Sequence, residues 1–285
     1  MKAIKCEKVT KKYKDKLVLD SIDLELEKGK IYGLIGRNAV GKTTLLSLIA
    51  AHNPVTSGEI TLDGETIWEN PDALEHICFA RQIAPANPMA ARQYFKVASM
   101  YYPKWDEEYA KKLIDIFELD VKKPMSKISK GMQSMVTIIV ALASKAEFTF
   151  IDEPVAGLDV IARDLFYKLL IEEYTESERT FVISTHIIDE ASDVFEEVIM
   201  LNNNKIIIKE NTQELLARTR YVSGKEDIVD KVTNGMDCHH AEVIGRSKSV
   251  TVLLNEGEDI KETEDITVRP VTLQNLFVAM CGKEV

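Results

Sequence analysis

Residues 36–43 read Gly-Arg-Asn-Ala-Val-Gly-Lys-Thr, and this octapeptide sets the architecture expected for the chain. It follows the apolar run Ile-Tyr-Gly-Leu-Ile at residues 31–35 and opens a helical segment at about Lys42. A G-x-x-x-x-G-K-[ST] pattern between a buried strand and a helix is typical of a phosphate-binding loop, because its glycines let backbone N–H groups turn toward the phosphates. The helix N-terminus adds positive potential. The sequence therefore predicts a nucleoside-triphosphate site.

Each polar residue of this loop has an expected role. Lys42 places a positive charge on the β- and γ-phosphates, and Thr43 offers its hydroxyl to Mg²⁺. The residues expected to bind the nucleotide through this loop are Gly36, Arg37, Asn38, Ala39, Val40, Gly41, Lys42, Thr43 and Thr44.

A second apolar strand ends in two carboxylates: residues 148–153 read Phe-Thr-Phe-Ile-Asp-Glu. A buried acid needs a partner, and a magnesium ion near Thr43 supplies one for Asp152. Glu153 stands one residue further on, where it can orient or deprotonate a water aimed at the γ-phosphate. We therefore expect Mg²⁺ beside the nucleotide and a catalytic role for Glu153.

The periodicity of the chain predicts an α/β fold. Alternation over the first thirty residues indicates antiparallel strands, and later strands alternate with helices, which is typical of a mostly parallel sheet with ligands at the carboxyl ends of its strands. The expected architecture is a P-loop NTPase core with an N-terminal antiparallel β-subdomain, a helical insert at about 85–146 and a small C-terminal α+β module. We expect domains at 1–220 and 221–285, and a helix running through Phe195 after the strand at 180–184.

Composition indicates an intracellular globular protein. The chain has 285 residues, with 36 basic and 46 acidic side chains and a net charge of −10, which disfavours a nucleic-acid partner. The longest apolar run, residues 135–143, is far shorter than the about 20 residues that a membrane-spanning helix needs. The charged N-terminus lacks the apolar core of a signal peptide, and the cysteines form no C-x-x-C pair, as expected in a reducing cytosol.

Two further motifs complete a recognisable order. Residues 128–133 read Ile-Ser-Lys-Gly-Met-Gln and begin a helix capped by Ser129, while Ala-Gly-Leu-Asp at 156–159 follows the acid pair and His186 ends the next strand. Phosphate loop, serine-capped helix, acid pair, A-G-L-D and strand-end histidine resemble, in that order, the ATP-binding cassette (ABC) family. The resemblance covers about residues 1–220.

This resemblance implies roles for five more residues. Tyr13 is similar to the aromatic residue that stacks on adenine, Gln82 to the glutamine that contacts Mg²⁺ and the attacking water, and His186 to the histidine that hydrogen-bonds the γ-phosphate. Ser129 and Gly131 would face the ATP held by a second subunit, because such cassettes work as head-to-tail dimers. The lysines around Tyr13 are expected to form a solvated edge: Lys11, Lys12, Lys14 and Lys16.

Lys130 departs from the family pattern, which usually has glycine at that position. The Ser-Lys-Gly-Met variant resembles exporter ATPases of the ABC-2 class. The resemblance thus implies an ATPase subunit, with ATP and Mg²⁺ as cofactors, on the cytoplasmic face of the membrane. Its partners would be separate transmembrane permease subunits and a second cassette, either an identical copy or a related chain.

Two other functions stay open on the sequence. A soluble ABC ATPase acting on ribosomes or DNA would usually carry two cassettes or a long coiled-coil insertion, and the net charge also disfavours it. A regulatory module that binds ATP without hydrolysing it would not need Asp152, Glu153 and His186 together. Nothing in the sequence indicates the cargo, the direction of transport beyond the Ser-Lys-Gly-Met variant, or the role of the C-terminal module.

Overall fold

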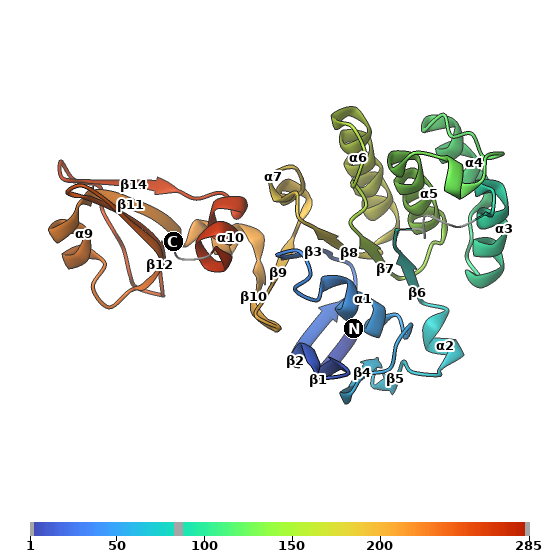
Figure 1. Cartoon of the computed structure of the whole chain (residues 1–285), viewed down its shortest axis with the longest axis horizontal. Coiled ribbons are helices and arrows are strands. Elements are labelled where there is room, and N and C mark those ends of the chain that lie inside the picture. Colours follow the sequence, from blue (N-terminus) through green and yellow to red (C-terminus); the bar gives the residue numbers. More distant parts are fainter. Residues whose placement is uncertain (1–2, 83–87, 283–285) are drawn as a thin grey trace. The chain divides into compact units, whose positions relative to one another are not determined.

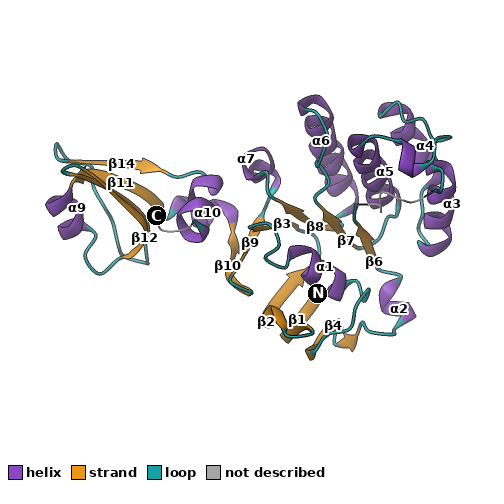
Figure 2. Ribbon diagram, viewed as in Figure 1, coloured by secondary structure: helices purple, strands orange, loops and turns teal. Residues whose placement is uncertain are grey.

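The computed structural model describes residues 3–82 and 88–282. The expected start of the helical insert, near residue 85, lies outside the described residues. The chain forms two compact units, Met1–His186 with Ile199–Ile208, and Ile187–Val198 with Lys209–Val285. Figures 1 and 2 show their helices and strands. The functional boundary expected at residue 220 stays a prediction.

The first unit begins with an antiparallel sheet in the order β2-β1-β4-β5. Its strands are β1 (Ala3–Tyr13), β2 (Lys16–Glu27), β4 (Ser57–Leu62) and β5 (Glu65–Thr66). Side chains along β1 and β2 alternate between buried and exposed positions, so one face of the sheet packs on the core while the other faces solvent.

The central sheet has the order β10-β9-β3-β8-β7-β6. Its strands are β3 (Ile31–Gly36), β6 (Ile77–Ala80), β7 (Phe148–Asp152), β8 (Thr180–Thr185), β9 (Glu197–Asn202) and β10 (Lys205–Asn211). Strands β3, β8, β7 and β6 run parallel, so their carboxyl ends meet at one edge. Helix α1 (Lys42–Ile49) lies between the two sheets, while α5 (Lys130–Ala143) and α6 (Val160–Ser177) cover the opposite face (Figure 1).

The helical part of this unit contains α2 (Pro71–Leu74), α3 (Ala91–Tyr101) and α4 (Glu107–Ile116) before α5. Asp106 and Ser129 cap α4 and α5, because each side chain accepts a hydrogen bond from the backbone N–H three residues later. One expected helix is shorter than predicted: instead of a helix through Phe195, the chain forms α7 (Ile188–Ala191) and a 3₁₀ turn over Ser192–Val194. The Ser192 hydroxyl donates to the backbone of Asp189, which competes with helical hydrogen bonding.

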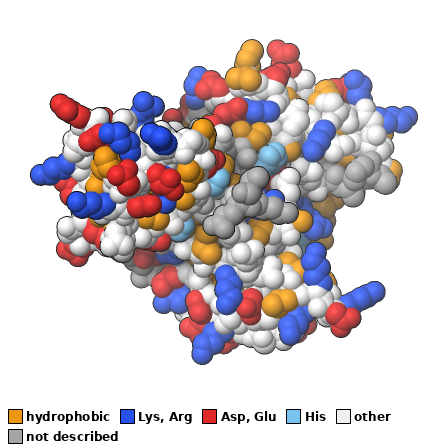
Figure 3. Space-filling model, turned by 60° about the vertical axis from the view of Figure 1, so that its left-hand side comes forward, with side chains coloured by type: hydrophobic (Ala, Val, Ile, Leu, Met, Phe, Trp, Pro, Cys, Tyr) orange, Lys and Arg blue, Asp and Glu red, His pale blue; other side chains and the backbone are white. Residues whose placement is uncertain are grey.

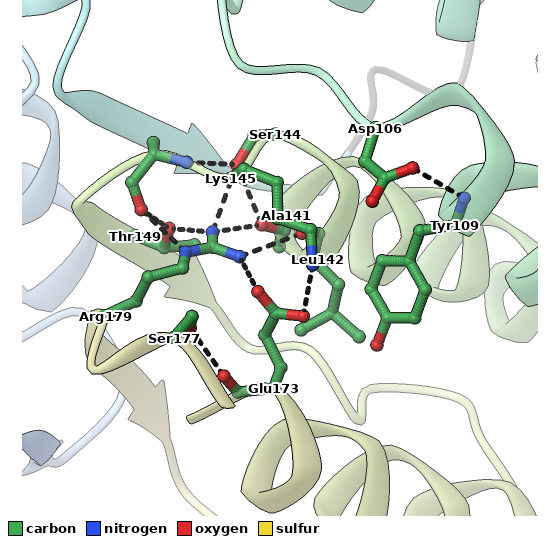
Figure 4. A network of polar contacts seen from close by, with 11 residues as sticks. Asp106, Tyr109, Ala141, Leu142, Ser144, Lys145, Thr149, Glu173, Ser177 and Arg179 are labelled. Carbon is green, nitrogen blue, oxygen red and sulfur yellow. Dashed lines mark hydrogen bonds and ion pairs between the residues drawn. The ribbon is translucent and has the colours of Figure 1, made fainter. Parts of the chain in front are cut away.

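A buried charge network joins the end of α5 to the sheet and to α6 (Figure 4). The Arg179 guanidinium donates to the carbonyl oxygens of Ala141, Leu142 and Ala146 at 2.9, 2.9 and 2.7 Å. It also pairs with Glu173 at 2.8 Å, and Glu173 pairs with Lys145. Arg179 therefore satisfies carbonyl groups that the helix end leaves without a backbone partner.

The second unit contains a four-stranded antiparallel sheet in the order β12-β13-β11-β14. Its elements are α7, α8 (Thr212–Ala217), β11 (Thr219–Lys225), α9 (Glu226–Val232), β12 (Asp237–Ile244), β13 (Ser247–Leu253), β14 (Ile266–Pro270) and α10 (Leu273–Cys281). Its core is a separate cluster that includes Val222, Val229, Val250 and Val252. The expected C-terminal α+β module is therefore present, and the α/β fold class is confirmed.

Acidic and basic side chains are intermixed on the surface drawn in Figure 3. Cys6, Cys78 and Cys281 are buried, and Cys238 is exposed. Among residues 3–82 and 88–282, none of the helices is both long enough and apolar enough to span a bilayer.

Candidate active site

The phosphate loop connects β3 to α1, as the octapeptide predicts. A side chain at Gly36 would place its Cβ 2.7 Å from the carbonyl oxygen of Leu201, so only glycine fits there. Gly41 has φ 119°, a conformation open to glycine, and it directly precedes the first turn of α1. The buried Lys42 ammonium donates to the carbonyl oxygen of Gly36 at 2.7 Å, which folds the lysine across the loop.

Asp152 lies at the end of β7 against the first turn of α1. The Thr43 hydroxyl donates to Asp152 Oδ2 at 2.7 Å, and the Asp152 side chain is buried. A hydroxyl and a carboxylate side by side are the hard oxygen donors that Mg²⁺ prefers. Thr43 and Asp152, two of the three residues expected to contact magnesium, are therefore together, and their chemistry fits that ion.

Glu153 lies between the loop lysine and the strand-end histidine. Its Oε1 is 3.7 Å from Lys42 Nζ, and its Oε2 is 2.6 Å from His186 Nδ1. Burial lowers the pKa of Lys42 below its usual value, while the carboxylates of Glu153 and Asp152 oppose that shift. The Lys42 ammonium and the N-terminus of α1 are suited to bind phosphate. Beside them, the Glu153 carboxylate and the His186 imidazole are suited to proton transfer.

Ser129 and Gly131 begin α5 and contact a different segment of the chain. The Ser129 hydroxyl accepts a hydrogen bond from Met132 N–H at 3.1 Å. A Cβ on Gly131 would lie 2.5 Å from the carbonyl oxygen of Gly157, so α5 packs closely on the A-G-L-D segment. Lys130, in the first turn of α5 beside Gly131, packs the base of its side chain against Gly157, and the residue as a whole is exposed.

Tyr13 and Gln82 are both exposed. Gln82 follows β6, at the edge of the sheet where β3, β7 and β8 also end. Tyr13 ends β1, and Lys11 Nζ lies 4.9 Å from the centre of its ring. The expectation of a solvated lysine edge is wrong for Lys11, which is buried because its ammonium donates to the carbonyl oxygen of Pro54 at 2.6 Å.

No sequence motif indicates a role for Ser184, two residues before His186. Its hydroxyl donates to Asp152 Oδ1 at 2.5 Å, and the side chain is completely buried. The available signal is a pair of hydroxyl residues, Ser184 and Thr185, after the apolar residues 181–183 in a central strand. That pattern becomes informative only once the partner of the hydroxyl is known.

Comparison with known proteins agrees with this arrangement. The fold and the site together define a P-loop ATPase, and the ABC transporter family profile matches residues 19–156. AlbC of Bacillus subtilis (strain 168) is 30% identical over 203 residues, which cover 68% of this chain and 84% of that relative. The chain therefore belongs to the ABC transporter family, as an ATP-binding subunit.

Two more relatives match over less of their own length. The ABC transporter ATP-binding protein YtrB of Bacillus subtilis (strain 168) is 28% identical over 193 residues, covering 66% of this chain and 65% of YtrB. The Nod factor export ATP-binding protein I of Sinorhizobium fredii (strain NBRC 101917 / NGR234) is 28% identical over 221 residues, covering 75% of this chain and 64% of that protein.

The fold also matches a solved structure, a dimeric ATP-binding cassette in a post-hydrolysis state bound to ADP and Pi. The TM-score is 0.64 at 21% identity, over 73% of this chain and 98% of that one. At this level of identity the likeness concerns the fold.

Proposed function

We propose that this chain hydrolyses ATP in a head-to-tail dimer on the cytoplasmic face of a membrane exporter with separate membrane subunits. The observation that carries the proposal is the convergence of Lys42, Thr43, Asp152, Glu153 and His186 at the carboxyl edge of one sheet. The Ser-Lys-Gly-Met variant and the similarity to a Nod factor export protein support export.

The contacts of Lys42, Thr43 and Asp152 support their proposed roles, while the resemblance to the ABC family supports those of Tyr13 and Gln82. Lys42 and the backbone N–H groups at the start of α1 bind the phosphates, and Tyr13 stacks on the adenine. Thr43, Asp152 and Gln82 hold Mg²⁺, which neutralises charge between the phosphates when bound. The other residues of the phosphate loop, within 36–44, are proposed to bind the nucleotide as well.

Glu153 is the proposed acceptor of the proton from the attacking water. Its carboxylate contacts both Lys42 and His186. Because an ionised carboxylate only accepts hydrogen bonds, His186 donates to Glu153 from Nδ1, and Nε2 can donate to the γ-phosphate as well when the ring carries its second proton. ATP binding would draw Lys42 toward the phosphates and free Glu153 for the water.

Ser129 and Gly131 are proposed to contact the ATP of a second subunit. Their contacts within this chain are to Met132 and Gly157. A single phosphate loop leaves the γ-phosphate accessible, and the capped N-terminus of a second α5 can cover it. Nucleotide then belongs to the dimer interface, and hydrolysis removes that contact.

The membrane subunit is proposed to dock in an apolar groove of about 600 Å³ in the first unit. The groove lies between the sheet edge at Phe79 and the helical insert, where Tyr94, Val97 and Tyr102 line it. Arg81 adds a positive charge at the same groove. A short amphipathic helix with an aromatic anchor matches this lining.

The test is Glu153→Gln. We expect this variant to keep ATP and Mg²⁺ binding, to dimerise in ATP, and to lose about 10²–10⁴-fold in turnover. Light scattering with and without ATP measures the dimer, and phosphate release measures turnover. Hydrolysis near the wild-type rate would contradict the role of Glu153, and a monomer in all conditions would contradict the dimer.

A further inference from the structure

Ser184 occupies the centre of the site without facing solvent. Strand β8, which carries it, lies between the phosphate-loop strand β3 and the acid-pair strand β7. In the register of the sheet, Ser184 is opposite Leu34 on one side and Asp152 on the other. Its exposed fraction is 0%. A completely buried hydroxyl here needs polar partners, and they identify what it does.

The Ser184 hydroxyl makes two hydrogen bonds, one to each residue of the acid pair. It donates to Asp152 Oδ1 at 2.5 Å and accepts from Glu153 N–H at 3.2 Å. The other oxygen of Asp152 accepts from Thr43 at 2.7 Å. The orientation of the Asp152 carboxylate is thus fixed from two sides, by one hydroxyl from α1 and one from β8.

The backbone of Glu153 also depends on this contact. Glu153 has φ 51°, in the left-handed region that residues other than glycine rarely adopt. Its N–H donates to both the carbonyl oxygen of Ser184 at 3.0 Å and the Ser184 hydroxyl. This strained conformation directs the side chain toward Lys42 and His186.

We propose that Ser184 is a positioning residue for ATP hydrolysis, which orients Asp152 for the magnesium ion and holds Glu153 in its left-handed conformation. The inference rests on the function proposed above. Ser184 is completely buried and acts through Asp152 and Glu153. Residues that orient a metal ligand in this way typically contribute about 10–100-fold to metal affinity or activity.

The test is Ser184→Ala, with Thr180→Val as the matched control. Thr180 is on the same strand and equally buried, and its hydroxyl accepts from Gly29 N–H at 2.8 Å. Both variants lose one buried hydroxyl, but only Ser184 contacts the acid pair. A general loss of stability would therefore affect the two variants alike.

The first readout is metal binding without turnover. In the Glu153→Gln background with ATP bound, the Mg²⁺ concentration for half-saturation is measured by calorimetric titration. We expect Ser184→Ala to raise it by about 10–100-fold and Thr180→Val to leave it within about twofold. The second readout uses otherwise wild-type chains, in which Ser184→Ala should lower kcat about 10–100-fold with KM for ATP nearly unchanged.

Ser184→Cys, which keeps a weak donor of similar shape, should recover part of both losses and serves if the alanine variant fails to fold. Unchanged Mg²⁺ binding and kcat in Ser184→Ala would overturn the inference, as would equal losses in Thr180→Val. If the wild-type chain itself hydrolyses no ATP with its membrane partner present, the proposed function fails instead. The two failures are thus distinguishable.

Discussion

The Ser134 hydroxyl donates a hydrogen bond of 2.7 Å to the carbonyl oxygen of Ala156. Ser134 lies one turn into α5, beyond Ser129 and Gly131, and Ala156 follows Glu153 by three residues. The contact is buried and is reinforced by the close approach of Gly131 to Gly157. These contacts join the first turns of α5 to the segment after the acid pair.

Ser134→Ala leaves the Ala156 carbonyl without this buried partner. We expect the free energy of unfolding to fall by about 1–3 kcal/mol, measured by urea denaturation. Ser99→Ala is the control, since the Ser99 hydroxyl bonds its own helix at an exposed site, and it should change stability by less than about 0.5 kcal/mol. Equal losses in the free energy of unfolding for the two variants would show that the Ser134 hydrogen bond does not stabilise the fold more than an exposed one.

Arg179→Met should be among the most destabilising single changes in the first unit. It removes one of the two cationic partners of the buried Glu173 carboxylate, leaving Lys145, and it removes the donors from the end of α5, for an expected loss of about 3–5 kcal/mol. Lys168→Met breaks only the exposed pair with Asp164 and should cost less than about 1 kcal/mol. Denaturant titration measures the free energy of unfolding of both variants. A loss for Arg179→Met as small as that for Lys168→Met would show that the buried network around Arg179 does not stabilise the fold.

Stability should fall in alkali because of Cys6. Burial, followed by the nearby Asp23 carboxylate, raises the pKa of the Cys6 thiol from 9.0 to about 12. The unfolded chain releases the thiol proton at lower pH than the folded chain does. The contribution of this thiol to the free energy of unfolding is therefore fully present below pH 9 and is lost as the pH rises toward 12.

The comparison is between wild type and Cys6→Ala, each unfolded in urea at pH 8 and pH 10. The stability difference between them should change by about 1.4 kcal/mol in the alanine variant's favour at the higher pH. A difference independent of pH would show that the thiol ionises as easily in the folded chain as in the unfolded one.

The docking groove is tested with Val97→Glu. Val97 lines the groove and is 39% exposed, so a carboxylate there should prevent an apolar helix from seating without disturbing the fold. We expect the variant to keep the ATPase rate of the isolated chain and to lose its association with membranes in fractionation. Val278→Glu, on α10 in the second unit, should remain membrane-associated. Retention of Val97→Glu on membranes would rule out this groove as the docking surface.

The features predictable from sequence are those encoded locally. The octapeptide, the acid pair and the alternating strands and helices depend on short-range pattern, and the structure has them as expected. Strands β11 and β14 were not predicted, because β11 contains Gly224 and β14 ends in Pro270, and both owe their conformation to pairing in the sheet. The contact of Ser184 with Asp152 and that of Arg179 with Leu142 each span about thirty residues or more, and side-chain partners at that separation have no sequence pattern.

The uneven burial of the thiols has a practical consequence for experiments. Because Cys238 on β12 is exposed while Cys6, Cys78 and Cys281 are enclosed, a maleimide dye should attach at one position of the native chain. The label would sit in the second unit, remote in sequence from the nucleotide loop. Fluorescence from that dye would then report whether ATP turnover changes the surroundings of the C-terminal module.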